Sequence, residues 1–143
     1  MAFLATMLLA VTMNPNDKME EIYNFFSNTE YKESARTIVA LSVLESGWYR
    51  SPVHREFNNY FSYKEFRRAH QHSLCRKRPI YCMRQFKDLN ESLEVMLDFF
   101  RRNNYPTDRK GFLRRLDGKG GLRFAEDPEH INKIKQLKRQ IGI

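Results

Sequence analysis

Apolar residues recur at the three- and four-residue spacing of an amphipathic helix in several parts of the chain. One part differs, because residues 38–44 are apolar throughout except for Ser42, which indicates a helix buried on all sides. The patterns predict helices over residues 19–26, 35–45, 89–100, 112–116 and 128–141.

Residues that favour helix ends mark several of these boundaries. Gly47 follows the buried run and predicts its C-terminal end, since glycine readily takes the left-handed conformation found there. Asp88 with Glu91 predicts a capped start for the helix over 89–100. Asp127 followed by Pro128 predicts an N-cap with proline at the first position of the last helix.

Residues 57–86 have a different character. They are rich in Phe and Tyr, strongly basic and interrupted by Pro79, which predicts short strands or a hairpin rather than a long helix. We therefore predict an α+β fold: one mostly helical domain over residues 14–143 with a small β-hairpin insertion at about 57–86.

The first 13 residues are almost wholly apolar. Their length resembles the apolar core of a signal peptide, but the first basic residue is Lys18, and the stretch is too short to span a bilayer. We expect a retained segment that packs on the domain or on a neighbouring subunit, with a non-classical export signal as the alternative.

The chain is basic. It has 143 residues, 25 Lys and Arg against 17 Asp and Glu, and a net charge of +8, which favours an anionic partner. Nucleic acid, an anionic membrane surface and bacterial cell wall all qualify. Nucleic acid is not expected as the partner, because the chain lacks the Gly-aromatic signature of an RNA-recognition strand and the spacing of a zinc finger.

Glu45 lies at the end of the buried run, directly before Ser46, Gly47 and Trp48. Poor solvation and the negative end of the helix dipole should both favour its protonated form, which is the form that a general acid needs. Pattern alone favours a simpler interpretation, in which Glu45 is a surface residue or a partner for one of the cations.

Aromatic residues are concentrated just after Glu45. Six of them fall within 16 residues, and their faces either stack on sugar rings or form a small aromatic core. They are Trp48, Tyr49, Phe57, Tyr60, Phe61 and Tyr63.

Two blocks, Ala40–Trp48 with Ser51 and Asn58–Lys64, together resemble the glucosaminidase domain of glycoside hydrolase family 73. That family typically reads A-x-x-x-L-E-S-G-W-G-x-S, followed by N-N-L-F-G-I-K. Downstream, Arg84–Phe86 resembles its F-R-x-Y segment, and Phe124–His130 resembles its Y-A-T-D-P-x-Y motif. The resemblance covers roughly residues 34–135.

The resemblance implies a lysozyme-like fold and cleavage of the β-1,4 bond between N-acetylglucosamine and N-acetylmuramic acid in peptidoglycan, without a cofactor. The family includes autolysins, flagellar muralytic enzymes and phage-borne wall hydrolases. Glu45 matches its catalytic acid. Trp48, Asn59, Phe61 and Phe124 fall at groove positions, and Tyr49 and Tyr63 complete the expected substrate contacts.

Four positions depart from the family pattern. Tyr49 and Ser62 stand where the family has Gly, and Phe124 and His130 stand where it has Tyr. No second catalytic carboxylate is evident; Glu65 is the nearest candidate, and attack by water or by the substrate's acetamido group would make one acid sufficient. The alternative is a non-catalytic wall-binding module, or a virion or envelope component, on the same fold.

The cysteines leave three alternatives open. Cys75 and Cys82 are separated by six residues across the expected hairpin, and they are either free thiols or a disulfide. With His70 and His72 they would also offer four zinc ligands, although in no standard spacing.

The expected place of action is the bacterial cell wall or periplasm. Without an ordinary signal peptide, a phage particle or a holin could deliver the enzyme there. The segment over residues 1–13 would then contact virion or envelope assembly partners.

Overall fold

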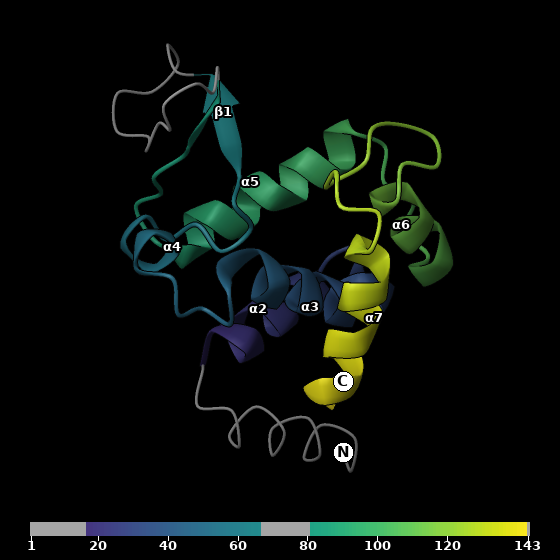
Figure 1. Ribbon diagram of the computed structural model, residues 1–143, viewed down its shortest axis with the longest axis horizontal. Coiled ribbons are helices and arrows are strands. Elements are labelled where there is room, and N and C mark those ends of the chain that lie inside the picture. Colours follow the sequence, from purple (N-terminus) through teal and green to yellow (C-terminus); the bar gives the residue numbers. More distant parts are fainter. Residues whose placement is uncertain (1–16, 67–80, 143) are drawn as a thin grey trace.

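The computed structural model describes residues 17–66 and 81–142, and this part of the chain is mostly helical (Figure 1). The elements are α2 (Asp17–Ser27), the 3-10 helix η1 (Lys32–Ser34), α3 (Ala35–Ser46), α4 (Pro52–Glu56), β1 (Lys64–Phe66), β2 (Tyr81–Met83), α5 (Leu89–Arg102), α6 (Arg109–Leu116) and α7 (His130–Gln140).

Helix α3 is the centre of the fold. Its residues from Ile38 to Val43 are all buried, as the apolar run predicted, and α2 and α7 pack against it (Figure 1). An apolar helix gains most when neighbours cover every face. The α2 and α7 faces that do this are the ones that their periodicity predicted, with Ile22 and Phe26 on α2 and Ile134 on α7 fully buried.

A second part of the core is aromatic. Phe26, Tyr31, Phe100 and Phe112 meet with centroids 5.0–6.0 Å apart, mostly edge to face. The Tyr31 hydroxyl donates to the carbonyl of Tyr105 at 3.0 Å, which satisfies the polar end of a buried ring. These contacts join α2 and η1 to α5 and α6.

The predicted β insertion is only partly present as strands. Strands β1 and β2 pair antiparallel over three residues each, with Lys64 opposite Met83 and Phe66 opposite Tyr81. Residues 57–63, expected within the insertion, form turns instead. The connection between the strands lies outside the described residues, as do His70, His72, Cys75 and the apolar segment over residues 1–13.

Helix starts agree with the prediction at one place and differ at two. Asp88 accepts a hydrogen bond from the Glu91 amide at 2.8 Å and caps α5 as predicted. Helix α6 begins earlier than expected, because Asp108 caps it through the Gly111 amide at 2.8 Å.

The start of α7 was predicted too early. The Asp127 side chain accepts from the Glu129 amide, and its carbonyl accepts from the His130 amide at 3.1 Å. This tight turn places Pro128 before the helix rather than at its first position, and α7 begins at His130. None of the helices in the described part of the chain is long and apolar enough to cross a membrane.

Candidate active site

Glu45 lies in the last turn of α3, with its side chain 20% exposed. The helix stops directly afterwards because Gly47 takes the left-handed conformation, at φ 59°. The Trp48 amide then donates back to the Val43 carbonyl at 2.9 Å, and the Gly47 amide to Leu44 at 3.5 Å. This is the hydrogen-bond pattern of a Schellman helix end, and it leaves the Glu45 carboxyl at the rim of the core.

The turn after Glu45 is strained. Trp48 and Tyr49 continue the left-handed conformation of Gly47, each with φ 60°, at a cost of roughly 1–2 kcal/mol per non-glycine residue. Tyr49 contacts α3 twice: its hydroxyl lies 2.6 Å from the Ser42 hydroxyl, and its amide donates to Ser46 at 3.0 Å. Burial raises the pKa of Tyr49, so its hydroxyl keeps its proton.

His130 is the side chain that contacts the Glu45 carboxyl. Its Nε2 lies 3.1 Å from Glu45 Oε1, although the two residues are 85 positions apart. The His130 side chain is 7% exposed and stacks on Phe124 with an interplanar angle of 11°. Its Nδ1 is buried without a hydrogen-bond partner among the described residues, so Nε2 is the nitrogen that engages Glu45.

A series of side-chain hydrogen bonds reaches the backbone of Glu45. The Ser62 hydroxyl donates to the Glu45 carbonyl at 3.0 Å, and His54 Nε2 lies 2.6 Å from the same hydroxyl oxygen. Because Ser62 has already used its proton, His54 Nε2 must be the donor. In the neutral imidazole, His54 Nδ1 is then the acceptor for the Ser51 hydroxyl, 2.7 Å away. These hydrogen bonds connect α4 to the end of α3.

Three of the predicted substrate contacts are buried in the core. Tyr49, Asn59 and Phe61 are 3%, 1% and 2% exposed, so little of these side chains lies at the protein surface. The Asn59 amide group donates to the carbonyls of Tyr63 and Arg84, and its oxygen accepts from the Tyr63 amide. It holds the Tyr63 turn beside the segment that follows β2.

The other three predicted contacts, Trp48, Tyr63 and Phe124, are partly exposed and pack against the core cluster. Phe99 of α5 connects two of them, edge to face, at 6.1 Å from Tyr63 and 6.0 Å from Phe124. We call Tyr63, Phe99, Phe124 and His130 the aromatic row. It runs from the turn before β1 to the Glu45 carboxyl.

Sequence reasoning did not select two members of this row. His130 stands where the family has Tyr, and this departure from the family pattern is the one feature of the sequence that could have indicated its place in the site. Phe99 carried no comparable signal, because it falls outside the apolar face that defined α5.

The remaining candidates contribute less. Glu65 lies on β1, and its backbone is paired opposite Cys82 of β2. The strand register gives the position of the Glu65 backbone alone. Within residues 17–66 and 81–142, no three His, Cys, Asp or Glu side chains are grouped as a metal site would require. His70, His72 and Cys75 lie outside that part.

Comparison with known proteins addresses the family directly. A family model, Glucosaminidase, described as mannosyl-glycoprotein endo-beta-N-acetylglucosaminidase, matches residues 23–142. The searches of curated proteins and of solved structures gave no match. The matched region contains Glu45, the strained turn and the whole aromatic row. The chain therefore belongs to the glucosaminidase family, glycoside hydrolase family 73, which makes it a glycoside hydrolase of the peptidoglycan-cleaving kind that acts at the cell wall.

Proposed function

We propose that this chain cleaves the β-1,4 bond between N-acetylglucosamine and N-acetylmuramic acid, with Glu45 as the general acid. The observation that carries the proposal is the contact between Glu45 and His130 at the end of the aromatic row. It combines a partly exposed acid, an imidazole nitrogen within hydrogen-bond distance that orients it, and aromatic faces suited to sugar rings. The mostly helical fold with one small antiparallel strand pair is consistent with a lysozyme-like architecture.

The hydrogen bond from His130 suits an acid catalyst. With Nε2–H donating to Oε1, the other carboxyl oxygen of Glu45 carries the proton toward the glycosidic oxygen. As that proton leaves, negative charge develops on the carboxylate, and the same hydrogen bond becomes charge-assisted and stronger. An interaction that strengthens toward the transition state accelerates the chemical step.

The attacking group in this proposal is water or the acetamido oxygen of the substrate. Either makes Glu45 sufficient as the single protein acid. The partly exposed rings of Tyr63 and Phe124 would position the sugar on which the positive charge develops.

A direct test compares Glu45→Gln with the wild-type chain in a zymogram on purified peptidoglycan. We expect the variant to lose the cleared band, because an amide N–H is far too weakly acidic to protonate the glycosidic oxygen. Glu56→Gln is the matched control, since Glu56 is an exposed glutamate at the end of α4. It should clear peptidoglycan like the wild type. Clearing by Glu45→Gln at the wild-type level would eliminate Glu45 as the acid.

One observation favours a second function. Phe124 has no hydroxyl at a position where the family has Tyr, which fits a wall-binding module without activity, carried by a virion or an envelope assembly. Binding of the wild-type chain to peptidoglycan without any clearing would select this function.

A further inference from the structure

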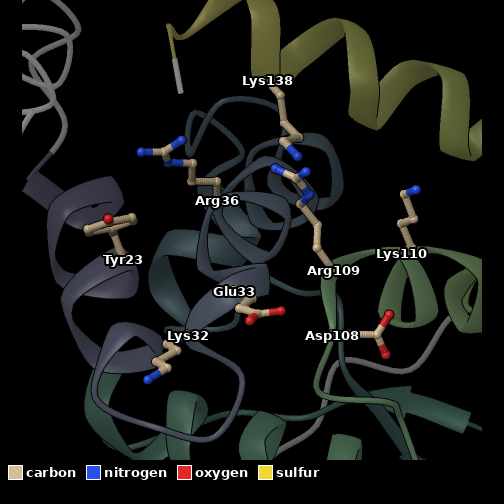
Figure 2. Close-up of a pocket in the computed structure, with 8 residues that line it drawn as sticks. All are labelled: Tyr23, Lys32, Glu33, Arg36, Asp108, Arg109, Lys110 and Lys138. Atoms are coloured by element: carbon tan, nitrogen blue, oxygen red, sulfur yellow. The ribbon is translucent and has the colours of Figure 1, made fainter.

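A cavity of about 570 Å³ lies at the other end of α3 from Glu45. Eight residues line it (Figure 2): Tyr23, Lys32, Glu33, Arg36, Asp108, Arg109, Lys110 and Lys138. They come from α2, η1, the first turns of α3 and α6, and α7. Arg36 and Glu45 are nine residues apart, about 14 Å along the helix axis, so this cavity is separate from the acid.

The charge of the lining is strongly positive. Five of the eight residues are Lys or Arg, and two are acids. One of the acids, Asp108, is already engaged, since it accepts the Gly111 amide as the cap of α6. The first turn of α3 adds the partial positive charge of a helix N-terminus.

Lys138 and Arg36 are the two partly buried cations of this lining. The ammonium group of Lys138 donates to the Thr37 hydroxyl at 3.2 Å. Burial, followed by the positive charges of Arg109 and Arg36, lowers the pKa of Lys138. Figure 2 shows the ends of Lys138 and Arg109 directed toward each other, and no carboxylate contacts Lys138 among the described residues.

The partly buried ammonium of Lys138 and the exposed guanidinium of Arg109 repel each other, and an anion between them would relieve that repulsion. We propose that this cavity binds a phosphate-type oxyanion, held by Arg109 and Lys138 with Lys110 beside them. The guanidinium fork of Arg109 can donate two parallel hydrogen bonds to such a group, and the lysines contribute point charges. The cavity is larger than one phosphate and open enough for a segment of a polyol-phosphate chain, so the source is either free phosphate or a phosphate-bearing polymer.

This proposal does not depend on the glycosidase activity. It is tested by titrating inorganic phosphate into the full chain at constant ionic strength, with chloride as the reference anion, and following backbone amide shifts by NMR. We expect saturable shifts at Arg109, Lys110 and Lys138. Arg109→Gln should bind roughly tenfold more weakly, as expected for the loss of one charge-assisted contact.

Arg114→Gln is the matched control, because Arg114 is exposed on the same helix and does not line the cavity. It removes the same charge and should bind phosphate like the wild type. Shifts that do not saturate, that chloride reproduces, or that Arg109→Gln and Arg114→Gln weaken equally would overturn the proposal.

Lys138→Met gives a second readout, which does not require tight binding. Without phosphate, removing the uncompensated cation should raise the Tm above that of the wild type. Added phosphate should then stabilise the wild type and leave Lys138→Met unchanged. The proposal would be contradicted if Lys138→Met had a lower Tm than the wild type and phosphate still stabilised it as much as it stabilises the wild type.

The source of the anion is distinguished by an oligomer of glycerol phosphate. If the oligomer binds more tightly per phosphate group than inorganic phosphate does, the site is supported and its ligand is a polymer, which gains affinity from contacts with neighbouring repeats. Equal binding supports the site with free phosphate as its ligand. Glu45→Gln should bind both probes normally, which separates a failure at this cavity from a failure of the proposed catalysis.

Discussion

Replacing His130 with Phe isolates the hydrogen bond that we assign to catalysis. The substitution keeps a ring stacked on Phe124 and removes only the group that contacts Glu45. A hydrogen bond to a charged group contributes roughly 1.5–3 kcal/mol. At 3.1 Å, with Glu45 20% exposed, this one belongs in the lower half of that range. The expected loss in kcat is therefore roughly 13- to 45-fold.

Stability should change little in the same variant. His130 Nδ1 is buried without a partner in the described structure, and a phenyl ring removes that cost while it also removes the bond to Glu45. The two effects oppose each other, so we expect a Tm close to that of the wild type. A loss of activity without a loss of stability would distinguish a positioning role from simple packing.

The assay measures kcat and KM for clearing of purified peptidoglycan, with Tm measured on the same samples. His130→Gln is the conservative variant, because its amide N–H can still donate to the carboxylate, and it should recover most of the activity. Wild-type kcat in His130→Phe would refute the reasoning. Equal losses in the Phe and Gln variants would refute it too, since only one of them lacks the donor.

Three further predictions concern stability. Ser62→Ala and Ser62→Gly should both lose the bond to the Glu45 carbonyl, about 1 kcal/mol, and Ser62→Ala should be the less stable of the two in urea, because only alanine is strained at φ 54°; the reverse order would contradict this. Tyr49→Phe should lower the free energy of unfolding by about 1 kcal/mol through its lost hydroxyl contact, also measured in urea. The hydrogen bond from Arg101 lowers the pKa of Glu30, so this pair stabilises the fold fully above the ordinary carboxyl pKa and loses that effect as pH falls through the lowered pKa. The Tm difference between wild type and Glu30→Gln should therefore shrink as pH falls below the ordinary carboxyl range.

Two departures from the family pattern have a common explanation. Tyr49 and Ser62 stand where the family has Gly, and both have positive φ, at 60° and 54°. Glycine adopts that conformation without strain. Here each side chain instead hydrogen-bonds to α3, Tyr49 at Ser42 and Ser62 at the Glu45 carbonyl. These contacts offset strain in two turns that follow the acid in the chain.

The hydrophobic pattern predicted the main helices because each buries a continuous face. Helix α4 was missed, since five residues are too few to show a helical period. The two strands are similarly short, and their pairing depends on contacts such as those of Asn59, which no local pattern encodes.

The candidate site was predictable only in part. Glu45 is recognised from the residues around it in sequence, whereas its contact with His130 depends on the packing of α7 against α3. Motif positions also do not reveal exposure. Phe61 and Phe124 both match groove positions of the family, yet one ring is buried in the core and the other joins the aromatic row.

The most direct test of the central claim is mass spectrometry of the fragments released from purified peptidoglycan, after reduction of their new sugar ends. We predict reduced N-acetylglucosamine at the ends made by the wild-type chain, and no new ends with Glu45→Gln. Reduced N-acetylmuramic acid from the wild type, or new ends at the wild-type rate from Glu45→Gln, would contradict the account.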